Sequence, residues 1–177
     1  NKQIIFFYNT VSESERIEEL KKVNEITGIR FIINEGYYRK KLKEVIELEK
    51  PDVIILPDFI ENHADHYKIA EELYFVLKNR PDFKVKILMY EIWTPHQPNV
   101  VIDITNYIEK KIEVLKLYKS QLKNKDYINM VTGLNSYRAA YLKYSENDIE
   151  NKIKYAESFV LIHSAEEFVN LYEYSHK

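Results

Sequence analysis

Short apolar segments alternate with helical patterns in the first part of the chain, and this alternation limits the fold more than any other feature. Residues 4–8, 29–33 and 53–56 are largely apolar and have the length of strands. The first is typical of a strand buried on both faces of a sheet, and we also expect the third to be buried. Residues 17–26 and 38–50 carry apolar side chains at helical spacing. Strand, helix, strand, helix, strand is the order typical of a parallel α/β sheet.

Several helix ends carry their own signals. Ser12 followed by Glu15 fits a capping box, and Gly28 stands where a helix commonly ends in a left-handed residue. Ser164 followed by Glu167 predicts a second capping box, which opens a C-terminal helix.

The rest of the chain continues the pattern. We expect helices over residues 69–77, 105–122 and 127–144, and strands over residues 85–93, 99–104 and 156–162. Thr105 or Asn106 is expected to cap the long helix. No linker or charge block divides the sequence, so we expect one domain of 177 residues.

Composition excludes several classes of partner and site. Lys and Arg number 26 against 28 Asp and Glu, and both signs are interspersed, so we expect no nucleic acid partner. Cysteine is absent, so a metal site would have to use His and carboxylate ligands. No apolar run approaches the roughly 20 residues of a membrane span, and the start lacks a signal-peptide pattern. We therefore expect a cytoplasmic protein without a transmembrane segment.

A polar loop follows the apolar strand at 53–56. Ligands of open α/β sheets bind beyond the carboxyl ends of the strands. We therefore expect the loop to bring one group of polar side chains together, namely Asp58, Glu61, His63, Asp65 and His66.

The last three of these residues form an H-x-D-H cluster. His63 and His66 are three residues apart and would lie on one face of a helical turn, where Asp65 can accept a ring N–H and orient a histidine. This geometry allows one metal ligand and one acid/base group. Two polar histidines at an exposed helix N-terminus are an equally good interpretation of the spacing, because a zinc site needs three or four ligands.

Longer segments carry a family resemblance. PDVIILPDFIENHADHYKIA at 51–70 resembles the second motif of the LmbE-like (PIG-L) family of zinc-dependent de-N-acetylases, although Ala64 stands in place of the proline of its H-P-D-H. Four other segments resemble the family in the same order: RIEELKKVNEITGI at 16–29, YEIWTPHQPNVVIDIT at 90–105, EKKIEVLKLYKSQL at 109–122 and YAESF at 155–159. The resemblance implies a Rossmann-like, three-layer α/β/α fold with a mostly parallel sheet.

The resemblance also implies an activity and residue roles. His66 would bind zinc, His63 would stabilise the oxyanion or protonate the leaving amine, and Asp65 would orient a histidine. The reaction would be hydrolysis of the N-acetyl group of an amino sugar, such as N-acetylglucosamine, or of its conjugate.

The first motif of the family, H-P-D-D-E, is missing, and no histidine precedes His63. Matching the segment at 16–29 makes residues 4–8 the second strand of the family. The chain also begins with Asn rather than Met. We therefore expect that the first strand–helix unit is absent, that zinc binds only when this unit is supplied, and that the chain alone is inactive.

Other candidates have two interpretations each. Asp58 and Glu61 flank the histidines and are candidates to bind substrate. His96 would line the substrate mouth or be a solvated loop histidine, and Arg138, in a segment similar to a family Y-R-G, would contact a sugar or form a surface salt bridge. Asp103 would support the site or cap the following helix.

Two functions follow from this sequence. The first is the zinc-dependent de-N-acetylase, a hydrolase of which this chain is the C-terminal part. The alternative is a non-catalytic sugar-binding or assembly module on the same scaffold. The sequence leaves the oligomeric state open, a homo-oligomer included.

Overall fold

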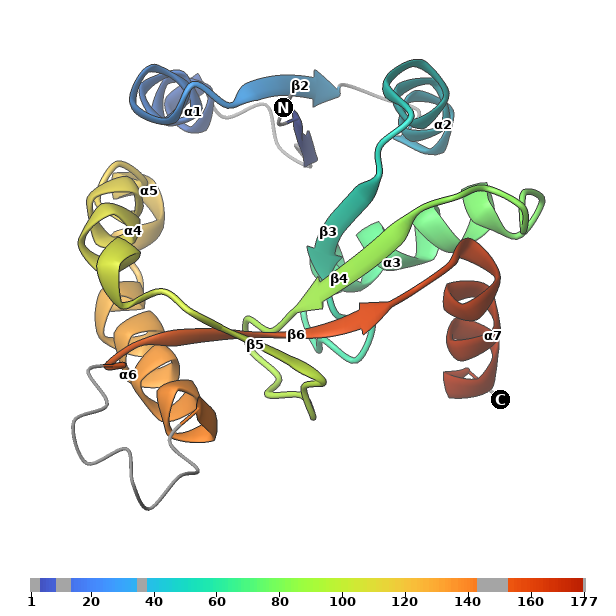
Figure 1. The fold of residues 1–177 in the computed structure, drawn as a ribbon. Helices are drawn as coiled ribbons and strands as arrows, with labels where there is room; N and C mark the ends of the chain where they lie inside the picture. The colour runs from blue at the N-terminus through green and yellow to red at the C-terminus, as the bar shows by residue number, and fades with distance from the viewer. Residues whose placement is uncertain (1–3, 9–13, 35–37, 143–152, 177) are drawn as a thin grey trace. The chain divides into compact units, whose positions relative to one another are not determined.

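The structure is a computed structural model that describes residues 4–8, 14–34, 38–142 and 153–176 (Figure 1). The chain divides into two compact units. The first comprises residues 1–33 and 101–157, and the second comprises residues 34–100 and 158–177.

The first unit begins with a small sheet. Strands β1 (Ile4–Tyr8) and β2 (Arg30–Asn34) form this two-stranded sheet, and helix α1 (Ser14–Thr27) lies between them in sequence. Gly28 has φ of 69° and donates its N–H to Asn24 O at 2.7 Å, so the predicted helix end is confirmed. The capping box predicted at Ser12 lies outside the described residues.

The long helix predicted over 105–122 is wrong as one element. The chain instead forms η1 (Thr105–Tyr107), α4 (Ile108–Leu115) and α5 (Lys119–Leu122). Buried Glu19 of α1 explains why a separate helix, α5, begins at Lys119. Its carboxylate accepts the backbone N–H and the hydroxyl of Ser120, each at 2.7 Å. Neither Thr105 nor Asn106 caps η1. The Asp103 carboxylate accepts the Thr105 N–H at 2.8 Å, but the N-cap of η1 is Ile104, so Asp103 contacts the start of the helix without being the cap that the sequence suggested.

Helix α6 (Tyr127–Ala139) follows in the same unit and continues into η2 (Ala140–Leu142). Asp126 caps α6 by accepting the Asn129 N–H at 3.1 Å. The rest of the helix predicted to residue 144 lies outside the described residues.

The second unit contains most of the larger sheet. The strands of this sheet are β3 (Val53–Pro57), β4 (Lys86–Tyr90), β6 (Ala156–Ile162) and β5 (Val100–Asp103), in the order β3-β4-β6-β5 (Figure 1). The boundary between the two units falls within β5 and β6. Strand β3 is parallel to β4, whereas β6 is antiparallel to β4, so a mostly parallel sheet is not confirmed.

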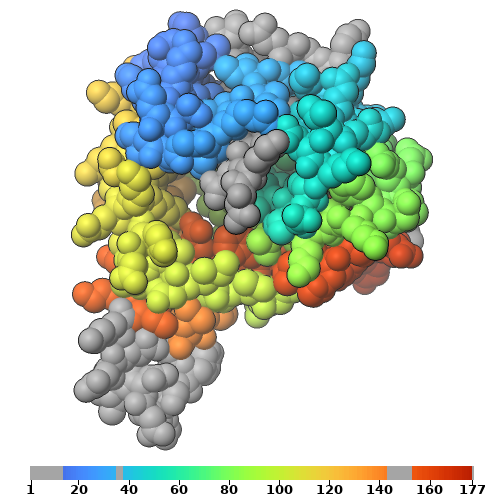
Figure 2. Space-filling view, turned by 45° about the horizontal axis from the view of Figure 1, so that its top comes forward, coloured from blue at the N-terminus to red at the C-terminus, as the bar shows by residue number. Residues whose placement is uncertain are grey.

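Three helices complete the second unit: α2 (Tyr38–Glu49), α3 (Ala64–Leu77) and α7 (Ala165–Ser175). Helix α2 packs beside α3, cyan beside green in Figure 2, and α3 contacts β3 and α7. The predicted capping box at Ser164 is confirmed, because its hydroxyl accepts the Glu167 N–H at 3.1 Å. None of the described helices combines the length and the apolar character of a membrane span.

The core of the second unit lies on one face of β3, β4 and β6. Its buried members come from both the strands and the helices: Ile46, Leu56, Ala70, Leu73, Val76, Leu77, Val85, Ile87, Met89, Ile162, Ala165 and Phe168. The predicted burial of the strand at 53–56 is confirmed for one face of β3 and wrong for the other. Val53 and Ile55 are 43% and 60% exposed, because they alternate with the residues that pack into this core.

An ion-paired carboxylate joins α2 to α3. Glu72 Oε2 accepts Arg39 Nε at 2.6 Å, and Lys68 Nζ lies 3.2 Å from Glu72 Oε1. Burial alone would raise the pKa of Glu72, but its hydrogen bonds with Arg39 and Lys68 outweigh burial and lower it. A carboxyl with a lowered folded-state pKa stabilises the fold above its unfolded-state pKa. This stabilisation is lost as the pH falls through the folded-state pKa.

Glu72→Gln should therefore lower the free energy of unfolding by about 1–3 kcal/mol near neutral pH, because it weakens two charge-assisted contacts of a buried group. The difference from the unchanged protein should shrink below the ordinary glutamate pKa of about 4.3. Urea unfolding near neutral pH and at a pH below this pKa measures the difference in the free energy of unfolding. Glu44→Gln, at an exposed pair with Lys41, is the control and should change little. An equal loss at both pH values would contradict the assigned role of the charge.

Candidate active site

The candidate site lies at the carboxyl ends of β3 and β4, where the sequence placed it. It is built from the loop after β3, the start of α3 and the loop at 91–96 after β4. Asp58 N donates to Tyr90 O at 2.9 Å and joins the two strand ends. Because β3 and β4 are parallel, both loops leave the sheet on the same side.

A buried carboxylate, that of Glu61, connects the two loops. Its Oε1 atom accepts three successive backbone N–H groups, those of Ile92, Trp93 and Thr94, at 2.7, 2.9 and 3.2 Å. These bonds turn the chain away from the sheet. They explain why β4 ends at Tyr90, earlier than the predicted strand.

The second oxygen of the same carboxylate faces His66. Glu61 Oε2 lies 3.4 Å from His66 Nδ1, and the His66 ring is partly buried. In the tautomer that donates Nδ1–H to Glu61, Nε2 carries the lone pair. Burial lowers the pKa of His66, the neighbouring His63 lowers it further, and the hydrogen bond with Glu61 opposes both. The imidazole is therefore neutral near neutral pH, the form in which histidine binds metals.

His63 stands beside His66, as the spacing predicted. Their ring centroids are 4.6 Å apart and the rings are inclined by 31°. His63 is the N-cap of α3, with φ −91° and ψ 123°, and its Nδ1 accepts the Asp65 N–H at 3.3 Å. Its side chain is exposed to solvent. The two histidines therefore form one pair at the N-terminus of α3.

Asp65 touches this pair through its backbone. No hydrogen bond within the described part of the chain joins the Asp65 carboxylate to either ring, and Glu61 is the carboxylate that reaches His66. The sequence suggests Glu61 only as a substrate contact. Glu61 lies five residues before His66, in the loop that precedes α3. Helical spacing therefore does not predict that the two side chains meet. The catalytic role of Asp65 stays a prediction.

The structure contradicts the interpretation of His96 as a solvated loop residue. His96 is 6% exposed, and its Nδ1 lies 2.9 Å from Oδ2 of Asp58, which is 3% exposed. Its Nε2 lies 3.3 Å from the Ser158 hydroxyl, which donates to Glu91 Oε1 at 2.6 Å. Sequence reasoning missed Ser158 and Glu91, although both fall in segments that resemble the de-N-acetylase family.

Arg138 belongs to α6 in the first unit, whereas the histidine pair belongs to the second. Its side chain is 2% exposed, and its guanidinium carbon lies 5.1 Å and 5.3 Å from the ring centroids of Tyr141 and Tyr137. The interpretation as a surface salt bridge is therefore wrong. A contact with sugar stays a prediction.

The donors at the histidine pair do not make a complete zinc site. Within the residues that the structure describes, no group of three or more His, Cys, Asp or Glu side chains is arranged to hold a metal ion. His66 can supply one nitrogen, and Glu61 is engaged by the loop amides. Because catalytic zinc takes three protein ligands, these residues alone do not fit it.

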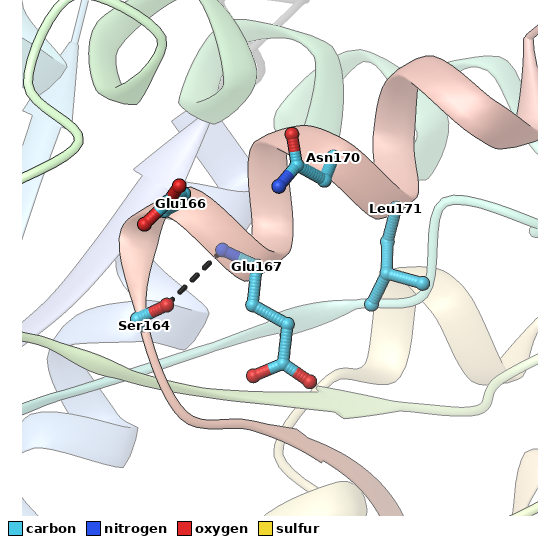
Figure 3. A pocket seen from close by; sticks show the side chains of 5 residues that line it. All are labelled: Ser164, Glu166, Glu167, Asn170 and Leu171. Atoms are coloured by element: carbon cyan, nitrogen blue, oxygen red, sulfur yellow. Dashed lines mark hydrogen bonds between the residues drawn. The ribbon is translucent and has the colours of Figure 1, made fainter.

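A separate shallow pocket of about 390 Å³ lies on α7 (Figure 3). Its lining comes from that helix and its N-cap: Ser164, Glu166, Glu167, Asn170 and Leu171. The bond from the Glu167 N–H to the Ser164 hydroxyl crosses it, which identifies it as the surface of a helix start. Neither His63 nor His66 lines this pocket.

Solved structures with a similar backbone are known for this chain. No protein-family model matches the sequence. The conserved protein TT1542 from Thermus thermophilus is 19% identical, with a TM-score of 0.68 over 90% of this chain and 80% of that chain. The antimicrobial reagent A40926 pseudoaglycone deacetylase Dbv21 is 12% identical, with a TM-score of 0.61 over 92% of this chain and 86% of that chain.

A third structure is a deacetylase in the biosynthesis pathway of teicoplanin. It is 10% identical, with a TM-score of 0.55 over 85% of this chain and 73% of that chain. Likeness at such low identity concerns the course of the backbone. The chain therefore has an α/β fold shared with these deacetylases, which supports the LmbE-like fold that the resemblance implied.

Proposed function

We propose that this chain is the histidine-bearing part of a hydrolase domain that removes the N-acetyl group from an amino sugar or its conjugate. The observation that carries the proposal is the pair of His63 and His66 at the carboxyl end of β3, with His66 held by a buried carboxylate. The fold is shared with two proteins named as deacetylases, one of a pseudoaglycone and one in teicoplanin biosynthesis. An N-acetylglucosamine conjugate is the substrate class to test.

His66 is the proposed metal ligand of this site. Its neutral ring, oriented through Nδ1 by Glu61, matches the carboxylate–histidine arrangement that supports metal ligands in proteins. Zinc, when bound, would polarise the acetyl carbonyl and lower the pKa of a bound water. A catalytic zinc takes three protein ligands, of which His66 is the one that we assign.

His63 is the proposed proton donor. Because its Nδ1 accepts the Asp65 N–H, the neutral ring carries its proton on Nε2. The Nε2–H of the neutral ring can donate a hydrogen bond to the oxyanion of a tetrahedral intermediate. Transfer of a proton to the departing amine needs the imidazolium form of His63, which becomes the neutral ring in that step. Asp65 supports this tautomer through its backbone.

The non-catalytic module remains the second candidate. The incomplete donor set at the histidine pair favours it. Asp58 and His96, two candidates for substrate binding, are buried and bonded to each other, which leaves fewer groups for a sugar. Binding of zinc to a form to which the other ligands have been restored distinguishes the two functions.

The 177-residue chain alone should bind zinc weakly and show negligible deacetylase activity, because the residues that the structure describes offer one well-oriented ligand. Metal content after dialysis against a chelator, together with turnover of an N-acetylglucosamine conjugate, measures both properties. Stoichiometric zinc that survives dialysis, with turnover, would contradict the prediction and establish a complete site in this chain.

The roles of the histidines can be separated in a form to which the other ligands have been restored. His66→Ala should lose zinc and activity together. His63→Ala should keep zinc and lose kcat by about 10²–10⁴-fold, the usual contribution of a general acid. His163→Ala, at an exposed histidine, is the control. If His63→Ala also empties the site, the two roles are wrongly assigned.

A further inference from the structure

We propose that His96 is a positioning residue that anchors the loop at 91–96 and thereby fixes the His66 ring. The inference rests on the proposed role of His66. It requires neither bound zinc nor turnover, so it can be tested on the chain alone.

The first half of the loop is held by Glu61. Three backbone N–H groups of residues 92–94 point at Oε1 of this carboxylate, and Oε2 faces His66. The loop and the histidine therefore share one acceptor. A displacement of the loop would release the side chain that orients His66.

The second half of the loop is held by His96. Its ring bridges Asp58, just after β3, and Ser158 on β6, and the side chains of His96 and Asp58 are 2% and 4% exposed. The backbone N–H of His96 also donates to Glu91 Oε2 at 3.2 Å, so the two ends of the loop are hydrogen-bonded to each other. Ser158 completes the link through its hydrogen bond to Glu91.

The energetics favour a tight anchor. A buried polar group that loses a hydrogen-bond partner destabilises the conformation that buries it. Loss of the His96 ring would remove one partner each from the buried Asp58 carboxylate and the buried Ser158 hydroxyl. The loop would then be held through the hydrogen bonds of residues 92–94 to Glu61. With the second anchor gone, the loop would open locally more often and take Glu61 with it.

The order Asp58, His96, Ser158 resembles a nucleophilic triad, but the geometry assigns it another role. Ser158 is 3% exposed, so a substrate has no access to its oxygen. Its hydroxyl donates to Glu91, whereas an activated serine would donate to the histidine. The group therefore holds the loop.

Two probes report on the anchor in the 177-residue chain. Trp93 is the single tryptophan and lies in the loop, so quenching of its fluorescence by acrylamide reports on loop opening. The hydrogen-bonded Nδ1–H signal of His66 in NMR spectra reports on its contact with Glu61. In His96→Ala, quenching should rise and the His66 signal should be lost, while the helical circular dichroism is kept.

Two variants make the result specific. His96→Asn places an amide N–H near the former Nδ1, so it should keep the bond to Asp58 and restore both signals toward those of the unchanged protein. His163→Ala removes an exposed histidine and should alter neither signal.

The proposal is overturned if His96→Ala lowers stability but leaves both signals unchanged, since His96 would then be structural only. If His96→Ala does not fold, Ser158→Ala decides instead. It removes one hydroxyl and must also raise quenching and weaken the His66 signal, and unchanged signals would again overturn the proposal. Absence of zinc binding and activity would affect the proposed function and not these results.

Discussion

The candidate site depends on the burial of one carboxylate, that of Glu61. Removing a carboxylate from water costs several kcal/mol unless hydrogen bonds replace its hydration. Three loop amides and the His66 ring supply those bonds. The same bonds end β4, shape the loop after it and orient the histidine. One desolvated group thus couples the backbone of one loop to the side chain of another.

A second buried carboxylate, Asp58, repeats this arrangement with an imidazole as its partner. Asp58 and Glu61 lie three residues apart in one loop, and both have partners in the loop after the neighbouring parallel strand. Buried polar networks of this kind define a single loop conformation, because each alternative leaves a buried group unpaired. The polar residues after β3 therefore include two buried ones that hold the loops, Asp58 and Glu61, and one exposed one, His63.

Features that depend on near neighbours in the chain were predictable from the sequence. The end of α1 at Gly28 and the start of α7 at Ser164 follow from local backbone geometry and capping bonds, so their residue types suffice. The pairing of His63 with His66 follows from helical spacing. The position of the cluster after β3 follows from the apolar run that precedes it.

Only the tertiary structure decided which distant groups meet. His96 is buried because Asp58 and Ser158, 38 and 62 residues away, converge on it. Glu19 shapes the start of α5 from 101 residues away, and β6 is antiparallel to β4. The sequence by itself determined the local elements and the identity of the chemical groups, because helix caps and side-chain periodicity act over a few residues. Strand neighbours and the partners of buried polar groups are set by long-range packing, which that periodicity does not encode.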